Sequence, residues 1–222
     1  MGKTSERRMV AIWDLPTRLF HWLLVGLMAV SYVTVEIGGN AMRLHAWSGF
    51  TILGLLLFRV AWGFAGSTPS RFTTFLVGPR PVKAYVQTML RPDGPHHLTH
   101  NPLGGWSVAA MLAAALVQAA TGLFANDDIM TQGPLNRLVS SQTGRLLTDL
   151  HELNADLILV LAAVHVVAVL FHLVYKHDNL IAPMITGRKP WTGPAGDMRP
   201  EPLWRALAIA ALSATAVWWI VR

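Results

Sequence analysis

The sequence contains no cysteine, and that absence narrows the ways in which it can hold a metal or cofactor. Disulfide bonds, thiolate-bound iron–sulfur clusters and covalently attached c-type haem all need cysteine, so all three are excluded. Any metal or cofactor must instead be held by histidine, methionine, carboxylate or main-chain groups. The placement of the nine histidines therefore carries the argument about function.

Charged residues are also scarce. They make up 14% of the 222 residues, whereas soluble domains carry about 25%. Hydrophobic residues make up 53%, and the mean hydropathy is +0.41. This balance favours an integral membrane protein, and the length suits one bundle rather than several large domains.

No cleavage site for a signal peptide follows the first apolar run. Met1–Arg8 is basic, but the next stretch, Met9–Arg18, contains Trp13, Asp14, Pro16 and Arg18, and no small-residue cleavage site follows the apolar run after it. We therefore expect the first apolar run to be retained as a transmembrane helix.

Five apolar segments have a length that suits a membrane span, which needs roughly 17–25 residues. They are Leu19–Val35, Leu44–Phe64, Trp106–Ala125, Leu153–Tyr175 and Leu203–Val221. The sequence thus predicts an all-α integral membrane fold.

The positions of the basic residues predict the orientation in the membrane. With the N-terminus inside, 14 of the 18 Lys and Arg residues fall on the inner side, and the other four are Arg43, Arg137, Arg145 and Arg222. Because Lys and Arg favour the cytoplasmic side, this distribution predicts N-in/C-out topology. It also explains the net charge of +6 without a nucleic-acid partner, since the basic residues lie in short loops between apolar runs.

The connections between the spans differ in character. Pro79–Leu90, in the inner loop, has apolar residues at helical spacing, which fits either a short interfacial helix or an ordinary surface turn. Asn126–Thr148 is a polar outer loop and a plausible docking surface, and Pro183–Pro202 is a Pro/Gly-rich linker. The inner loop also contains three histidines that we expect to be solvated, namely His96, His97 and His100.

Four histidines lie in or beside the predicted spans, where an ionisable side chain is costly and usually functional. They are His21, His45, His151 and His165. His151 and His165 are 14 residues apart on one predicted helix, which gives a rise of about 21 Å and leaves the rings about 40° apart around its axis. His45 matches the depth of His151 near the outer side, and His21 matches that of His165 nearer the inner side.

This placement is typical of two bis-histidine haem sites stacked across a membrane, because low-spin haem takes two axial ligands. An intramembrane histidine can also simply join helices by a hydrogen bond. A zinc site is a third interpretation, although it would bring its four ligands to one point. On the inner side His172, about 20° from the face of His165, competes with it as the partner of His21.

Short sequence fragments in a specific order resemble the bacterial cytochrome b561 family, which includes the b-type cytochrome subunits of nickel–iron hydrogenases. The fragments lie between residues 10 and 190 and are Trp13-Asp14, Arg18 with His21-Trp22, His45 with Gly49, Arg59 with Trp62-Gly63, Arg71-Phe72, Gly78-Pro79, Asn101-Pro102 with Gly104-Gly105, Thr121-Gly122, His151-Glu152, His165, Asn179-Leu180, Met184 and Gly187-Arg188-Lys189.

The resemblance implies a four-helix di-haem core in which two haem b groups are held from the first, second and fourth helices. By position, the ligands are His21, His45, His151 and His165. The resemblance also favours His165 over His172 as the inner ligand. Residues 1–190 would form this cytochrome domain, and residues 191–222 would add a linker and a further transmembrane helix.

Three arginines lie near the expected haems. Arg59 follows His45 by 14 residues, which places it one inter-haem depth further in, where it would meet a propionate of the inner haem. Arg18 and Arg43 each lie close to a ligand and would act in the same way. Snorkelling and the bias of basic residues toward the inner side are the alternative explanation.

These features predict electron transfer across the bacterial inner (cytoplasmic) membrane, between a redox partner and the quinone pool of a respiratory chain. The partner would be a periplasmic redox protein or another redox subunit, and membrane lipid would surround the bundle. A quinone- or superoxide-reactive membrane oxidoreductase acting alone and a haem-free membrane anchor subunit are the alternatives. The sequence leaves open the direction of electron flow, whether the chain is itself an enzyme, and whether it forms a homodimer.

Overall fold

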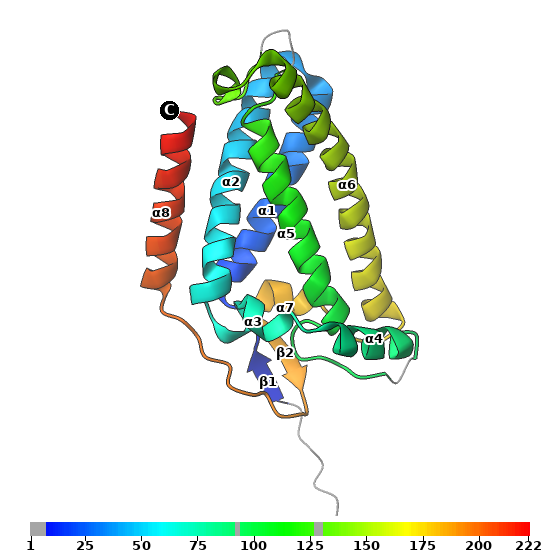
Figure 1. The fold of residues 1–222 in the computed structure, drawn as a ribbon. Helices are drawn as coiled ribbons and strands as arrows, with labels where there is room; N and C mark the ends of the chain where they lie inside the picture. Colours follow the sequence, from blue (N-terminus) through cyan, green and yellow to red (C-terminus); the bar gives the residue numbers. More distant parts are fainter. Residues whose placement is uncertain (1–7, 92–93, 127–130) are drawn as a thin grey trace, which may run out of the picture.

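A computed structural model of the chain describes residues 8–91, 94–126 and 131–222 (Figure 1). Five of its helices are long and apolar enough to cross a membrane. They are α1 (Leu15–Ile37), α2 (Met42–Ala65), α5 (Pro102–Gly122), α6 (Ser141–Val174) and α8 (Leu203–Val221). Each predicted apolar segment therefore corresponds to one of these helices, and the expectation of a multi-pass helical membrane protein is confirmed.

The remaining elements are short and lie at the ends of the bundle. They are the strands β1 (Arg8–Ala11) and β2 (Arg188–Trp191), the helices α3 (Phe72–Phe75), α4 (Pro79–Thr88) and α7 (Ile181–Thr186), and the 3₁₀ turns Gly39–Ala41, Thr68–Ser70 and Asn136–Leu138.

Polar caps determine where three of the long helices begin. The side chain of Asp14 accepts a hydrogen bond from the main-chain N–H of the third residue that follows it, and Asn101 and Ser140 do the same. Such a cap supplies an acceptor for a main-chain donor that lacks a partner within the helix. Proline follows Asp14 and Asn101 in the first turn of α1 and α5, where its missing N–H costs nothing.

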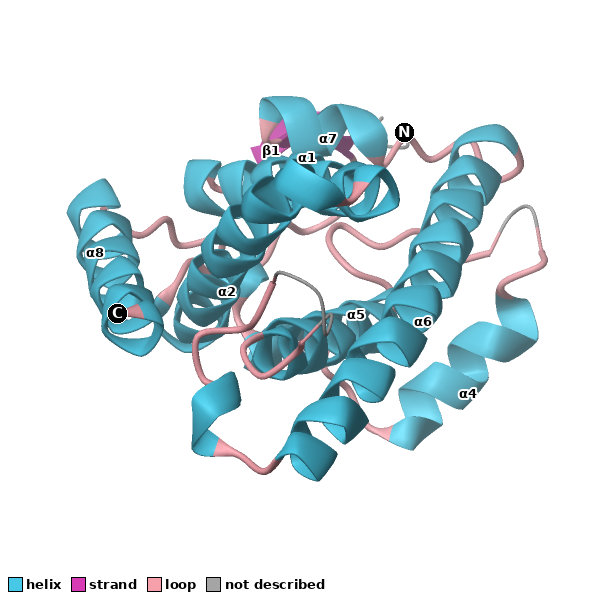
Figure 2. Ribbon diagram, turned by 90° about the horizontal axis from the view of Figure 1, so that it is seen from above, coloured by secondary structure: helices cyan, strands magenta, loops and turns pink. Residues whose placement is uncertain are grey.

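The helices α1, α2, α5 and α6 pack in this order, each against the next. The helix α8 packs against α2 at the periphery of the bundle (Figures 1 and 2). The main buried cluster lies between α1, α2, α5 and α8 and includes Phe20, the fully buried Leu56 and Trp62, Leu112 and Ala206. Most large apolar side chains on α6 are exposed instead, as expected for a helix surrounded by lipid.

The structure corrects one predicted loop. Ser140 caps α6, so the helix begins at Ser141 and includes about the last third of the segment Asn126–Thr148 that we expected to be an outer loop. Residues 127–130 of that segment lie outside the described residues. As a consequence His151 lies ten residues inside α6 rather than at its outer end.

The other two connections contain more structure than the sequence suggested. Pro79–Thr88 forms the helix α4, so this segment is a helix rather than a surface turn, and its place at the membrane interface stays a prediction. The predicted linker contains β2, which pairs with β1 in antiparallel register from Arg8 opposite Trp191 to Ala11 opposite Arg188. The fold remains mostly helical, and this short two-stranded ladder is an addition that the sequence did not predict, because strand pairing between distant segments leaves no local sequence pattern.

Candidate haem sites

The helix α6 contributes one histidine to each of two pairs. The ring centroids of His45, on α2, and His151 lie 6.2 Å apart. Those of His21, on α1, and His165 lie 6.4 Å apart. The structure therefore brings the four histidines together in the two pairs that their depths predict, and each pair joins α6 to a different helix.

These distances suit two imidazole rings that bind one metal ion from opposite sides. A metal–imidazole bond is about 2.0 Å long, so the two bonded nitrogens stand roughly 4 Å apart and the ring centroids roughly 6 Å apart. If the two rings of each pair only contacted each other, their centroid distance would have no reason to match this value in both pairs. The donor set of two imidazoles also fits a haem iron, which takes one axial ligand from each face of the porphyrin.

In the outer pair, hydrogen bonds orient both rings. Nδ1 of His45 lies 2.9 Å from the carbonyl oxygen of Ser31, and Nδ1 of His151 lies 3.0 Å from that of Gln118. Because a carbonyl only accepts, each Nδ1 must carry the proton, which leaves the lone pair of each Nε2 free to bind a metal. Metal-binding histidines generally make this second hydrogen bond, which fixes the tautomer and the ring orientation.

Gly122 lets the His151 ring lie close to α5. A Cβ atom at this position would stand 2.9 Å from Cε1 of His151, closer than such atoms pack. Both residues of the Thr121-Gly122 fragment thus contact His151, since Thr121 Oγ1 also lies 3.2 Å from Nδ1 of the same ring.

On the inner side, His172 makes contacts of its own and does not face His21. Its Nδ1 donates to the carbonyl oxygen of Ala168 at 2.9 Å. Its Nε2 lies 3.2 Å from the hydroxyl of Tyr85 and 3.4 Å from Nδ2 of Asn101. Both nitrogens of His172 are therefore engaged, whereas His165 is the histidine that faces His21.

The structure places the three candidate arginines differently. Arg59 is buried at 3% exposure, its guanidinium lies over the ring of Phe72, and its Nη1 has no hydrogen-bond partner among the described residues. Arg18 donates to the carbonyl oxygen of Ile185, while its Nε is buried without a partner in the same part of the chain. Arg43 is exposed beside the outer pair.

A family sequence pattern described as prokaryotic cytochrome b561 matches residues 12–187. The chain belongs to the prokaryotic cytochrome b561 family. The family consists of membrane-bound cytochromes that bind haem b and transfer electrons. Neither a search of curated proteins nor a search of solved structures gave a match.

The match to the cytochrome b561 family includes all of α1 to α7 and leaves α8 outside. All four paired histidines and the three arginines lie within it. The helix α8 contains none of these residues and packs on α2, so it is an addition to the part of the chain that the family shares.

The expectation of solvated loop histidines is wrong for two of the three residues in this cytochrome. The ring of His100 packs between Trp13 and Phe75, with centroid distances of 4.8 and 4.6 Å, and its Nδ1 is buried. Burial lowers the pKa of His100 to about 4, with smaller contributions from Arg59 and His165. His97 also has a buried Nε2, whereas His96 is exposed as expected.

One local signal could have placed His100 correctly. The next residue is Asn101, which caps α5 and is followed by proline in the first turn of that helix. A residue directly before a helix cap lies at the end of the bundle and not at the tip of a loop. The same cap brings Asn101 within reach of His172.

An ion pair stabilises the inner end of the bundle. Nζ of Lys189 lies 2.8 Å from the carboxylate of Asp178, and both side chains are buried. The same ammonium group donates to the carbonyl oxygen of His97 at 2.9 Å. These contacts connect β2, the segment after α6 and the loop before α5. They hold the three segments in a defined arrangement.

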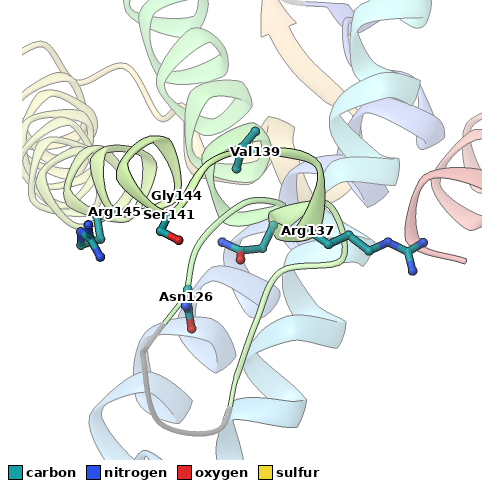
Figure 3. A pocket seen from close by; sticks show the side chains of 7 residues that line it. Asn126, Arg137, Val139, Ser141, Gly144 and Arg145 are labelled. Carbon is teal, nitrogen blue, oxygen red and sulfur yellow. The ribbon is translucent and has the colours of Figure 1, made fainter.

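A polar pocket of about 320 Å³ lies near the start of α6, well before His165 of the inner pair in the sequence (Figure 3). Its lining includes Asn126, Asn136, Ser141 and Gly144, and the side chains of Arg137 and Arg145 point in opposite directions. None of the paired histidines lines it, so this pocket is not a haem site.

Proposed function

We propose that this cytochrome holds two haem b groups and carries electrons across the bacterial inner membrane between a redox partner and the quinone pool. One observation supports this most directly: α6 places a histidine in each of two pairs with ring centroids 6.2 and 6.4 Å apart. The two histidines of α6 are 14 residues apart, so the two centres would be separated by about 21 Å along the helix.

The chain's own residues have separable roles in this proposal. His45 and His151 bind the outer iron, and the carbonyl groups of Ser31 and Gln118 hold their rings in place. His21 and His165 bind the inner iron. When bound, the haems supply one-electron carriers whose potentials depend on axial ligands, burial and nearby charge.

The arginines act on the propionates. Arg59 is the strongest candidate, because its guanidinium group is buried, forms no ion pair with the described residues, and would gain an anionic partner in a propionate. Arg18 would act on the same inner haem through its unpartnered Nε. Arg43, exposed two residues before His45, would meet a propionate of the outer haem where the site reaches water.

We place quinone at the inner end, near the edge of the inner haem, and the redox partner at the outer end. The polar groups around His172, namely Tyr85 and Asn101, support an inner quinone site because quinone oxygens need hydrogen-bond donors. The basic inner surface supports N-in/C-out topology.

The test is a count of haem per chain, from the reduced-minus-oxidised spectrum of the purified protein, followed by a redox titration. We expect two haems b with separate potentials. A count of one or none would overturn the di-haem proposal. Quinol added to the isolated protein should reduce the haems, and sustained turnover should need the redox partner. Steady turnover without a partner would instead indicate an oxidoreductase that acts alone.

A further inference from the structure

Several side-chain nitrogens are buried without a partner among the described residues. They are Arg18 Nε, His21 Nδ1, Arg59 Nη1, His97 Nε2 and His100 Nδ1. One belongs to His21 of the inner pair, and another belongs to His100, which interacts electrostatically with Arg59 and with His165 of that pair. Buried polar atoms are normally hydrogen-bonded, so a group of exceptions in one place points to a ligand there. Among these residues, Arg59 and His100 interact electrostatically, because the charge of Arg59 lowers the pKa of His100.

Among the residues that the structure describes, no carboxylate forms an ion pair with Arg59, although the charge of Asp14 acts on it from a greater distance. Asp14 is the nearest candidate, but its Oδ2 accepts hydrogen bonds from Trp62 Nε1 at 3.0 Å and from the hydroxyl groups of Ser67 and Ser70. Its Oδ1 caps α1. The Asp14 carboxylate is therefore taken up by other donors, and Nη1 of the buried Arg59 is left with a donor that a bound anion would use.

His100 approaches the same place from a different element. Trp13 and Phe75 hold its ring on two sides, so it has little freedom to turn toward water. It also lies close enough to His165 for the charge of that residue to lower its pKa. The buried Nδ1 of His100 therefore lies near both the unpartnered guanidinium group and the inner pair.

We propose that Arg59 and His100 together hold one propionate of the inner haem, Arg59 by an ion pair and His100 by a hydrogen bond from Nδ1–H. This inference rests on the proposed inner haem between His21 and His165, and it adds a residue of the inner loop to that site. The loop before α5 is then part of the haem site and closes it at the inner end. The neutral imidazole donates one hydrogen bond, and the guanidinium group balances the carboxylate charge.

The experiment compares the haem-loaded wild-type protein with H100F, which keeps a ring between Trp13 and Phe75 but has no donor. We expect the midpoint potential of the inner haem to fall in H100F, because the propionate charge is less compensated and disfavours an added electron. The potential of the outer haem should not change. The H165A variant, which retains only the outer haem, assigns the two potentials.

A second readout does not depend on electron transfer activity. In redox-induced infrared difference spectra, the propionate carboxylate bands should shift in H100F and return in H100Q, whose amide restores a donor. H96F, at the exposed neighbouring histidine, is the matched control and should keep the wild-type bands.

The outcomes separate the inference from the proposed function. Two haems with unchanged inner potential and unchanged carboxylate bands in H100F would overturn the role of His100 and leave the di-haem proposal standing. Equal shifts of both haems would also overturn it. If H100F loses the inner haem, H100Q must restore haem and bands, and its failure to do so counts against the proposal. Fewer than two haems in the wild-type protein would instead remove the proposed function itself.

Discussion

At the scale of single residues, the two histidines in the inner half of α6 have different surroundings. His165 faces His21 with ring centroids 6.4 Å apart, whereas both nitrogens of His172 are engaged by Ala168, Tyr85 and Asn101. Their side chains are seven residues apart and nearly on one face of the helix. The difference therefore comes from the helices packed around them and not from α6.

Replacement of each of these histidines by alanine tests the assignment of the inner ligand. We expect H165A to retain about half of the haem, because the outer pair is untouched, and H172A to retain all of it. The haem-to-protein ratio of the purified variants measures this. Loss of one haem in H172A together with full occupancy in H165A would reverse the assignment.

Gly122 provides a second test at the residue scale. In G122A the new Cβ would stand 2.9 Å from the His151 ring, so the ring must move and the outer haem should bind more weakly. We expect a lower haem content that is confined to the outer site, as measured by redox titration. G54A is the control, since its Cβ meets Val217 at an ordinary 3.7 Å. Equal haem loss in both variants would show a general packing effect instead.

At the scale of elements, a buried amide connects α5 and α6. Nδ2 of Asn154 donates to the carbonyl oxygen of Ala114 at 2.9 Å and to Oε1 of Gln118 at 2.7 Å. The main-chain carbonyl of the same Gln118 accepts from the His151 ring. One residue thus joins the two helices that position the outer ligand.

The variant N154L should lower the free energy of unfolding by about 1 kcal/mol, the usual size of a hydrogen bond between membrane helices. Thermal or denaturant unfolding in detergent measures the loss. L153A, at the adjacent and 68% exposed position, should change stability less because its side chain faces lipid. A larger loss in L153A than in N154L would show that this contact does not hold the helices together.

The loop before α5 is also an element with a defined place, and its His97 gives it a pH dependence. Burial, and next the charge of Lys189, lower the pKa of His97 in the folded protein. Between this lowered pKa and the ordinary value of about 6.5, the unfolded chain binds a proton that the folded chain does not. Stability should therefore fall as the pH drops below about 6.5, by less than about 1.4 kcal/mol per pH unit.

The midpoint of unfolding in denaturant, measured from pH 7 downward, should fall less steeply in H97Q than in the wild type. H96Q is the control, because the side chain of His96 is exposed. If the slope of H97Q matches that of the wild type, the acid sensitivity arises elsewhere.

At the scale of the whole molecule, the described residues contain five helices long and apolar enough to cross a membrane, and we expect five spans to put the two ends of the chain on opposite sides. The distribution of basic residues predicts that the N-terminus is inside. A protease-sensitive tag after Arg222 should be cleaved from outside in intact spheroplasts, while a tag at the N-terminus should be protected. A tag inserted in the inner loop before α5 serves as an internal control. Cleavage of both terminal tags from the same side would contradict five spans.

Sequence reasoning identified the five spans, the pairs of histidines by depth and the family, because each depends on local composition or on spacing along one helix. An apolar run of sufficient length must be buried in lipid, and a 14-residue spacing fixes both depth and direction on a helix. These properties do not depend on the neighbours of a residue. The helix boundaries were not all predicted. Ser140 caps α6, so this helix begins within the segment that we expected to be a loop.

The tertiary structure decided what depends on contacts between distant segments. It separated His165 from His172, placed His100 between Trp13 and Phe75, and paired β1 with β2. Spacing along a single helix assigns nearly the same face to both histidines of α6, and only the positions of α1, α4 and Asn101 tell them apart. The sequence therefore determined the membrane bundle and its candidate ligands, while packing between the helices determined which side chains meet.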